Sequence, residues 1–295
     1  VLAFACAFTM FAGAASYSDK ADIKASTAVD MLSSLGVIQG YEDGSFKPNT
    51  TVTRAQMAKM IFTIMNGGND NANAYASLPT KFTDLPTAAW AQGYVRYLQN
   101  TGIIAGKSAT KFAPNDTVTG LEAAKMVLVA AGYNAQKAGL TGAAWAQNTM
   151  KYGQLNNLFE DVDTDLNAAL PRQYAAQILY NALTKYLVEY GQVIKNGKAF
   201  DKAFIANESV SASGFTLAAK MGVGLKRSTD AFRLPGYTWS YGSWNKFYMD
   251  KLVNSYTTAV TMCDILKNDM KVPETSKKEV VLNGYRKGVD PTATG

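Results

Sequence analysis

The chain has 295 residues, of which 47% are hydrophobic and 18% are charged, with a formal net charge of +6 and no histidine. Its length allows one large domain or two to three small ones, and its apolar content excludes a wholly disordered protein. The lack of histidine excludes a Ser-His-Asp triad and metal sites with imidazole ligands. The basic excess suits an acidic partner, such as an anionic glycan or a membrane surface. The lysines form no run of five or more, so nucleic acid is not an expected partner.

The first 15 residues, VLAFACAFTMFAGAA, are apolar and uncharged. They are too few to span a bilayer, and Ala12-Gly13-Ala14 fits a signal-peptidase site. We therefore expect residues 1–15 to be a signal-peptide remnant; the alternative is a buried core helix. Cys6 would leave with this segment, so that Cys263 would remain alone without a disulfide. No later run of about 18 apolar residues occurs, and no membrane span is expected in the mature chain.

The next part of the chain is repeated. GVIQGYEDGSFKPNTTVTRAQMAKMI begins at Gly36, and GIIAGKSATKFAPNDTVTGLEAAKMV begins 66 positions later at Gly102. The two segments align without a gap, and agreement over this length is not expected by chance. A third copy is weaker. WAQ recurs at Trp145 after Trp90, and Arg172 in LPRQYAAQ occupies the position of Arg54 in VTRAQMAK.

Each copy predicts a helix, a loop and a second helix. In the second copy the apolar spacing indicates a helix that ends near Gly102, which suits a helix C-terminus; the residues are Trp90, Tyr94, Val95, Leu98 and Ile103. Thr119 and Glu122 then form a capping box, and Thr53 and Gln56 fill the same places in the first copy. The helix that follows carries an apolar face of Met57, Met60, Ile61 and Ile64. One helix pair buries little, so three stacked copies would share a core in a mainly α fold.

These motifs resemble the S-layer homology module. The first copy supplies Gly36-Val37-Ile38, Gly40-Tyr41-Glu42-Asp43-Gly44, Phe46, Pro48 and Thr53-Arg54-Ala55-Gln56, and the second supplies Phe82-Thr83-Asp84, Trp90, Gly102-Ile103-Ile104 and Pro114. The resemblance covers residues 16–185. It implies modules at 16–70, 78–134 and 138–185, the last divergent, arranged as a pseudo-three-fold helical bundle. Grooves between modules of this family bind secondary cell wall polysaccharide, often with pyruvate ketals, or modified peptidoglycan in some bacteria with outer membranes.

The resemblance further implies that an arginine of the T-R-A-E motif reaches the anionic group. The matching residues are Arg54 and, more loosely, Arg172. A guanidinium donates two parallel hydrogen bonds to a carboxylate, and a helix N-terminus beside it favours an anion. The full set of expected glycan-binding residues is Arg54, Gly40, Tyr41, Asp43, Gly44, Thr53, Asp84, Trp90, Lys107, Trp145 and Arg172.

Structural roles compete with these assignments. The tryptophans Trp90 and Trp145 fit a core as well as a sugar-stacking role, the glycines fit turns, and Asp84 fits a helix cap. The second copy has Gly120 where the motif places arginine, and Lys107 is the candidate to replace that charge. We therefore expect one competent groove at Arg54 and a second at Arg172.

Two further features bear on function. The run Asp161-Val162-Asp163-Thr164-Asp165 alternates carboxylates, but Leu166 and Arg172 stand where a Ca²⁺ loop needs Gly and Glu, so a solvated loop or helix start is expected. Residues 186–295 mix glycines, aromatics and lysines, and VNSYTTAVTMCDIL from Val253 is typical of a strand. This part predicts a mixed, β-containing region that begins a larger exported cargo domain and continues past residue 295.

The expected function is non-catalytic anchoring of an exported protein to the bacterial cell wall, without a cofactor. One alternative is a wall-remodelling enzyme whose catalytic part lies in or beyond residues 186–295. Another is a self-assembling subunit of a surface lattice, which is compatible with anchoring.

Overall fold

The computed structural model describes residues 17–185, 187–196, 198–205, 216–229, 235–241 and 244–249. The chain divides into two compact units, Val1–Gly222 and Val223–Gly295, which are described separately. The expected signal segment, both cysteines and the strand-like segment from Val253 lie outside the described residues.

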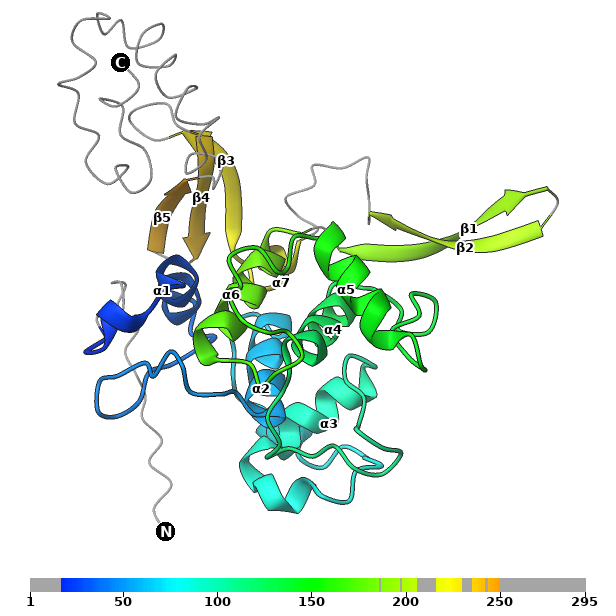
Figure 1. Ribbon diagram of the computed structural model, residues 1–295, viewed down its shortest axis with the longest axis horizontal. Coiled ribbons are helices and arrows are strands. Elements are labelled where there is room, and N and C mark those ends of the chain that lie inside the picture. Colours follow the sequence, from blue (N-terminus) through cyan, green and yellow to red (C-terminus); the bar gives the residue numbers. More distant parts are fainter. Residues whose placement is uncertain are drawn as a thin grey trace, which may run out of the picture. The chain divides into compact units, whose positions relative to one another are not determined.

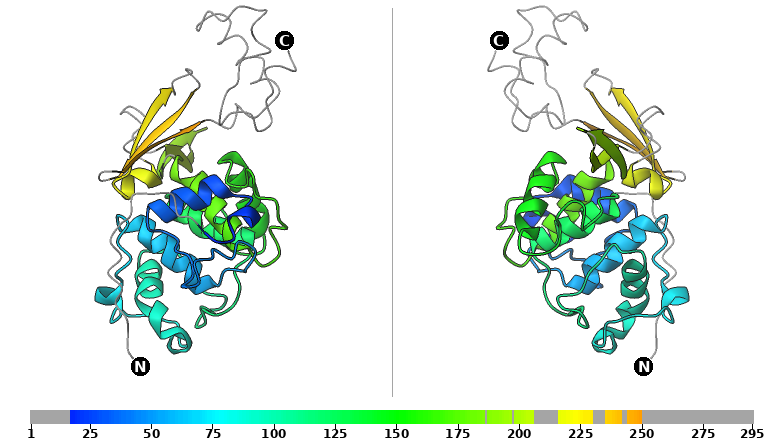
Figure 2. Two further views of the ribbon diagram at one scale, coloured as in Figure 1. Left: turned by 90° about the vertical axis from the view of Figure 1, so that its left-hand side faces the viewer. Right: turned by 90° about the vertical axis from the view of Figure 1, so that its right-hand side faces the viewer.

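The first unit is mainly helical, as expected (Figures 1 and 2). Its α-helices are α1 (Ser26–Ser34), α2 (Arg54–Met65), α3 (Gln92–Asn100), α4 (Gly120–Ala130), α5 (Trp145–Leu155), α6 (Arg172–Leu183) and α7 (Leu217–Lys220). Short 3-10 helices occupy Lys20–Asp22, Asn73–Tyr75 and Leu85–Ala91. Strands β1 (Val188–Lys195) and β2 (Lys198–Ile205) form an antiparallel hairpin in the same unit.

The second unit contains three described strands. They are β3 (Gly224–Thr229), β4 (Pro235–Tyr241) and β5 (Trp244–Met249). The strands form an antiparallel sheet in the order β3-β4-β5, with Thr238 of the middle strand opposite Lys226 and Phe247.

Local sequence signals set the helix ends. Both predicted capping boxes are confirmed: in the first, Gln56 N donates to Thr53 Oγ1 at 3.2 Å and Thr53 N donates to Gln56 Oε1 at 2.9 Å. Thr119 and Glu122 make the same pair of bonds at 3.2 and 3.0 Å. Gly102 follows the end of α3 at φ +75°, a left-handed conformation that glycine adopts without steric cost.

The helices pack across the copies rather than within them. The second helix of each copy (α2, α4 and α6) lies next to the first helix of another copy: α3 packs on α2, α5 on α4, and α1 on α6 (Figure 1). The second helices also meet in the pairs α2–α4 and α4–α6. The predicted apolar face of α2 is confirmed, since Met57, Met60, Ile61 and Ile64 are all buried. No copy could therefore bury its helices alone.

A closed ring of backbone hydrogen bonds joins the three loops that precede α2, α4 and α6. Val52 N donates to Leu170 O, Leu170 N donates to Val118 O, and Val118 N donates to Val52 O, each at 2.9 Å. The side chains of all three residues are fully buried. Buried backbone polar groups need partners, and this ring supplies them while fixing the three helix starts around one point.

Two of these loops, those before α2 and α4, are each held by a carboxylate of their own copy. Asp84 accepts hydrogen bonds from Phe112 N at 3.0 Å and Ala113 N at 2.8 Å. Asp19 accepts the equivalent bonds from Phe46 N and Lys47 N at 2.8 and 2.7 Å. Ala113 and Lys47 have φ values of +59° and +55°, which are uncommon for residues other than glycine. The carboxylates thus hold the loops in a conformation that the backbone alone disfavours.

Gly40 and Gly106, which are equivalent positions of the two copies, allow these loops to pack closely. A Cβ on Gly106 would lie 2.4 and 2.6 Å from the backbone oxygens of Lys111 and Ser108. A Cβ on Gly40 would lie 2.5 Å from the Tyr17 ring and 2.9 Å from Ser45 O. A ring edge can move more easily than two backbone carbonyls.

We therefore expect Gly106→Ala to destabilise the protein more than Gly40→Ala. Both losses should fall in the range of about 1–3 kcal/mol for an overpacked site, with Gly106→Ala at the upper end. Urea unfolding of the full chain followed by circular dichroism measures the two losses. An equal loss, or a larger one for Gly40→Ala, would contradict the close approach of the backbone at Gly106.

Candidate functional site

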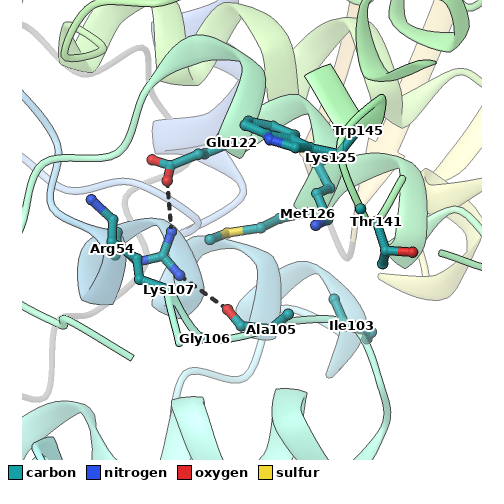
Figure 3. Close-up of a pocket in the computed structure, with 11 residues that line it drawn as sticks. Arg54, Ile103, Ala105, Gly106, Lys107, Glu122, Lys125, Met126, Thr141 and Trp145 are labelled. Carbon is teal, nitrogen blue, oxygen red and sulfur yellow. Dashed lines mark hydrogen bonds and ion pairs between the residues drawn. The ribbon is translucent and has the colours of Figure 1, made fainter. Parts of the chain in front are cut away.

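Two pockets line the junctions between copies. The Arg54 groove has a volume of about 570 Å³ and is lined by Arg54, Ile103, Ala105, Gly106, Lys107, Glu122, Lys125, Met126, Thr141, Gly142 and Trp145 (Figure 3). The Arg172 groove has a volume of about 230 Å³ and is lined by Gly36, Val37, Ile38, Gln39, Gly40, Tyr41, Gln56, Lys59, Met60 and Arg172.

The two grooves are built from the same repeat positions. Ile103, Ala105, Gly106, Lys107, Glu122, Lys125 and Met126 lie 66 residues after Val37, Gln39, Gly40, Tyr41, Gln56, Lys59 and Met60. One copy supplies the loop and the second helix, and another copy supplies the arginine. Arg54 of the first copy enters the groove of the second, and Arg172 of the third copy enters the groove of the first.

Both arginines are buried and held by the loop that they enter. Arg54 is 3% exposed; its Nε donates to Phe112 O at 2.8 Å and its Nη2 to Ala105 O at 3.0 Å. Arg172 is 8% exposed; its Nε donates to Phe46 O at 3.0 Å and its Nη2 to Gln39 O at 2.7 Å. Each guanidinium also lies against the phenylalanine ring of that loop, at 4.8 and 4.9 Å from the ring centroid. The arginines therefore fasten neighbouring copies together.

The third guanidinium nitrogen distinguishes the two grooves. Nη1 of Arg54 forms an ion pair with Glu122 Oε1 at 3.4 Å (Figure 3). Gln56 occupies the position equivalent to Glu122 in the other groove. Within the described part of the chain, Nη1 of Arg172 has neither a hydrogen bond nor an ion pair. Burial lowers the pKa of both guanidinium groups; Glu122 is the largest opposing influence on Arg54, and Tyr41 is the largest on Arg172. Both arginines stay cationic at neutral pH.

The lysines on the groove walls also differ. Lys59 pairs with Asp70 at 3.0 Å, whereas Lys125 has no ion pair among the described residues and lies 5.4 Å from the centroid of Trp145. Burial, followed by repulsion from Arg54, lowers the pKa of Lys125. Lys107 lines the Arg54 groove as well, where it pairs with Asp116 at 3.3 Å.

The aromatic residues take three different positions. Tyr41 lines the Arg172 groove, is 37% exposed, and has its ring centroid 4.9 Å from the Arg172 guanidinium carbon. Trp145 is half-buried in the wall of the Arg54 groove. Trp90 lines neither groove and is 54% exposed. The core interpretation of Trp90 is therefore wrong, since its ring lies on the surface beside Tyr94, at 6.2 Å between centroids.

Four expected site residues have structural contacts outside the groove walls. Asp84 holds its loop, Thr53 caps α2, and Gly44 forms a turn at φ +77°. Asp43 accepts a hydrogen bond from Ser45 N at 2.9 Å and pairs with Lys47 at 3.0 Å, and the Ser45 bonds and Lys47 lower its pKa to about 2.

The first-turn N–H groups of the helices are not open to a ligand. Arg54 N donates to Asp116 O at 2.9 Å and Ala55 N donates to Pro114 O at 3.0 Å. The start of α6 is bonded in the same way, with Arg172 N donating to Thr50 O and Gln173 N to Pro48 O. The idea that the helix N-terminus beside each arginine attracts an anion is thus wrong for these N–H groups, because carbonyls of the neighbouring copy occupy them.

The equivalent junction of the second and third copies is closed to an arginine. Gly120 begins α4 where Arg54 and Arg172 begin α2 and α6. A Cβ on Gly120 would lie 2.8 Å from Leu166 Cδ2 and 3.0 Å from Leu166 Cα. No side chain fits at this position without displacing the loop of the third copy.

Several lining residues were not predicted from the sequence, namely Lys59, Lys125, Met60, Met126 and Thr141. The sequence did contain one indication of the lysines and methionines, because Ala-Lys-Met recurs at the 66-residue offset on α2 and α4. The lysines and methionines fit ordinary helix positions, because the sequence did not show which helix face meets the neighbouring copy; Thr141 lies in the loop before α5.

Within the described ranges, no group of three or more His, Cys, Asp or Glu side chains is arranged to hold a metal ion. The acidic run Asp161–Asp165 forms an irregular loop, in which Asp163 pairs with Lys24 at 3.5 Å. None of the helices described combines the length and hydrophobicity needed to cross a bilayer.

Comparison with known families matches the S-layer homology domain to residues 16–58 and 81–124. Two regions of the chain are thus S-layer homology domain matches. The chain is 30% identical over 206 residues to a surface layer protein of Brevibacillus choshinensis, which covers 66% of this chain and 18% of that protein. It is 28% identical over 193 residues to the middle cell wall protein of Brevibacillus brevis, and this match covers 64% of this chain and 18% of that protein.

Another relative is named as an enzyme. The chain is 26% identical over 184 residues to exoglucanase XynX of Acetivibrio thermocellus, covering 57% of this chain and 16% of the enzyme. The chain spans less than a fifth of the length of these three relatives. The S-layer homology domains and the surface and cell wall relatives assign the chain to the bacterial cell surface.

The Asp84 contacts give a pH-dependent prediction. Burial raises the pKa of this carboxyl, but the N–H groups of Phe112 and Ala113 outweigh burial, so the pKa is lowered. The stabilisation is therefore fully present above the unfolded pKa of about 3.9, and it is lost as the pH falls through the lower folded value.

We expect Asp84→Asn to lower the free energy of unfolding by about 1–2 kcal/mol at pH 7. The difference from the unmodified chain should shrink as the pH falls below about 3.9. Urea titrations from pH 7 to pH 3 measure it, with Asp22→Asn as the matched control on an exposed carboxylate. A difference that stays constant with pH would show that the Asp84 charge is not responsible.

Proposed function

We propose that residues 16–185 form three S-layer homology modules that anchor this protein to an anionic polysaccharide of the cell wall. The modules correspond to residues 16–70, 78–134 and 138–185, and their arrangement is a pseudo-three-fold helical bundle. The cyclic hydrogen bonds of Val52, Val118 and Leu170 support this arrangement, because each of three loops donates to one neighbour and accepts from the other.

One observation carries the ligand assignment. Two grooves at equivalent repeat positions each combine a buried arginine, a lysine and an aromatic ring. Cationic groups attract the carboxylate or phosphate of a wall glycan, and an aromatic face packs against a sugar ring. The repetition of this combination favours recognition of a repeating polymer over a single small molecule.

Anchoring also accounts for the range of relatives. The relatives include a surface layer protein and an exoglucanase, and the matched part is a minor share of each. A non-catalytic anchor can be carried by proteins of different activity, so residues 186–295 would begin the part that is displayed. Assembly into a surface lattice is compatible with this role, and the name of the Brevibacillus choshinensis relative favours it.

Sedimentation of the full chain with purified cell walls tests the proposal. We expect the protein to pellet with intact walls and to stay in solution with walls from which acid-labile polysaccharide has been extracted. Wall binding should fall at least fivefold in the double variant Lys125→Gln/Gln56→Glu, which removes a cation from the Arg54 groove and adds a carboxylate to the Arg172 groove.

Lys20→Gln is the matched control, because Lys20 is exposed and lines neither groove. Its binding should equal that of the unmodified chain. Equal binding to intact and extracted walls would refute a polysaccharide anchor, and loss of binding in the control would show a merely charge-dependent attachment.

A further inference from the structure

We infer that the two grooves contact the anionic group through different cations: Nη1 of Arg172 in one, and Nζ of Lys125 in the other. Arg54 then acts as a structural clamp that Glu122 keeps from the ligand. The inference rests on the proposed function and specifies the residues that would carry it.

The first step concerns which charges are already neutralised. In the Arg54 groove, all three guanidinium nitrogens have partners: Phe112 O, Ala105 O and the carboxylate of Glu122. An anion approaching Arg54 would have to compete with Glu122 and would be repelled by it.

In the Arg172 groove the equivalent position is neutral. Gln56 replaces Glu122, and its Oε1 accepts the capping bond from Thr53 N. The nearby carboxylate of Asp19 accepts hydrogen bonds from Phe46 N and Lys47 N, and the ion pairs found among the described residues do not include one between Asp19 and Arg172. One guanidinium edge therefore keeps its charge and a donor for a ligand.

The lysines differ in the opposite sense from the arginines: the lysine with an ion pair lies in the groove whose arginine has none among the described residues. Lys59 of the Arg172 groove is paired with Asp70 at 3.0 Å, whereas Lys125 of the Arg54 groove has no ion pair within the described residues. Lys125 lies beside Trp145, and both line the same pocket (Figure 3). An acidic group of the glycan that binds Lys125 would thus place its sugar ring next to the Trp145 ring.

Residues 56 and 122 consequently set whether the arginine of each groove keeps a free charge for a ligand. They can be exchanged without loss of the helix caps, because glutamine and glutamate both close a capping box in this chain. Gln56→Glu should neutralise Arg172, and Glu122→Gln should release Arg54.

Nuclear magnetic resonance of the full chain, labelled with ¹⁵N at arginine and tryptophan, can follow both grooves in one titration. The probe is the acid-extracted wall polysaccharide. The Arg172 side-chain signals report on one groove, and the Trp145 indole signal reports on the other. Polysaccharide with its carboxyl groups reduced and its phosphates removed is the neutral control, and each treatment alone identifies which anion binds.

We expect Gln56→Glu to weaken binding at Arg172 about tenfold and to change binding at Trp145 by less than twofold. Lys125→Gln should weaken binding at Trp145 about tenfold and change binding at Arg172 by less than twofold. Glu122→Gln should strengthen binding at Trp145 severalfold and make the Arg54 signals respond to the polysaccharide.

Two results would overturn the inference. One is an Arg54 response in the unmodified chain that matches the Arg172 response and survives Lys125→Gln. The other is retained wall sedimentation with neither reporter shifting, which would leave anchoring in place but move it away from these grooves. Failure of the chain to sediment with walls would instead refute the proposed function itself.

Discussion

The ring of hydrogen bonds between Val52, Val118 and Leu170 is the constraint on which the rest of the helical unit depends. It brings together three loops that are far apart in the sequence, and it fixes where α2, α4 and α6 begin. Each helix start is then satisfied by carbonyls of a neighbouring loop, as Arg54 N is by Asp116 O. The buried polar groups of one copy are satisfied by another, so the copies must fold as one body.

This arrangement explains why buried arginines serve at the junctions. A guanidinium has five N–H donors in a fixed plane, which suits a gap lined by loop carbonyls. Arg54 and Arg172 both donate hydrogen bonds to such carbonyls from Nε and Nη2. Only the third nitrogen can differ between grooves, and the neighbouring side chain decides whether it serves structure or a ligand. Gly120, at the equivalent position of α4, has no side chain to make these contacts, and Leu166 packs at the place that an arginine side chain would occupy.

Much of the helical unit could be predicted from the sequence because its signals are local. Thr53 and Thr119 with their partners predict two helix starts, and Gly102 predicts the end of a third helix. The apolar face of α2 follows from helical spacing alone. Which helix packs on which could not be predicted, because the pairs α1–α6, α3–α2 and α5–α4 join different copies. The exposure of Trp90 was missed for the same reason.

The candidate site was predictable only as far as it follows the repeat. Arg54, Arg172, Tyr41, Gly40, Lys107 and Trp145 line the grooves, whereas Asp84 and Thr53 belong to the loop and cap that shape them. The sequence shows Gln56 and Glu122 as equivalent capping residues, and both close a capping box in the structure. Their difference matters only because the fold brings the guanidinium of another copy beside them. A neutral-for-charged exchange that keeps the helix cap can thus alter the charge that a binding groove presents.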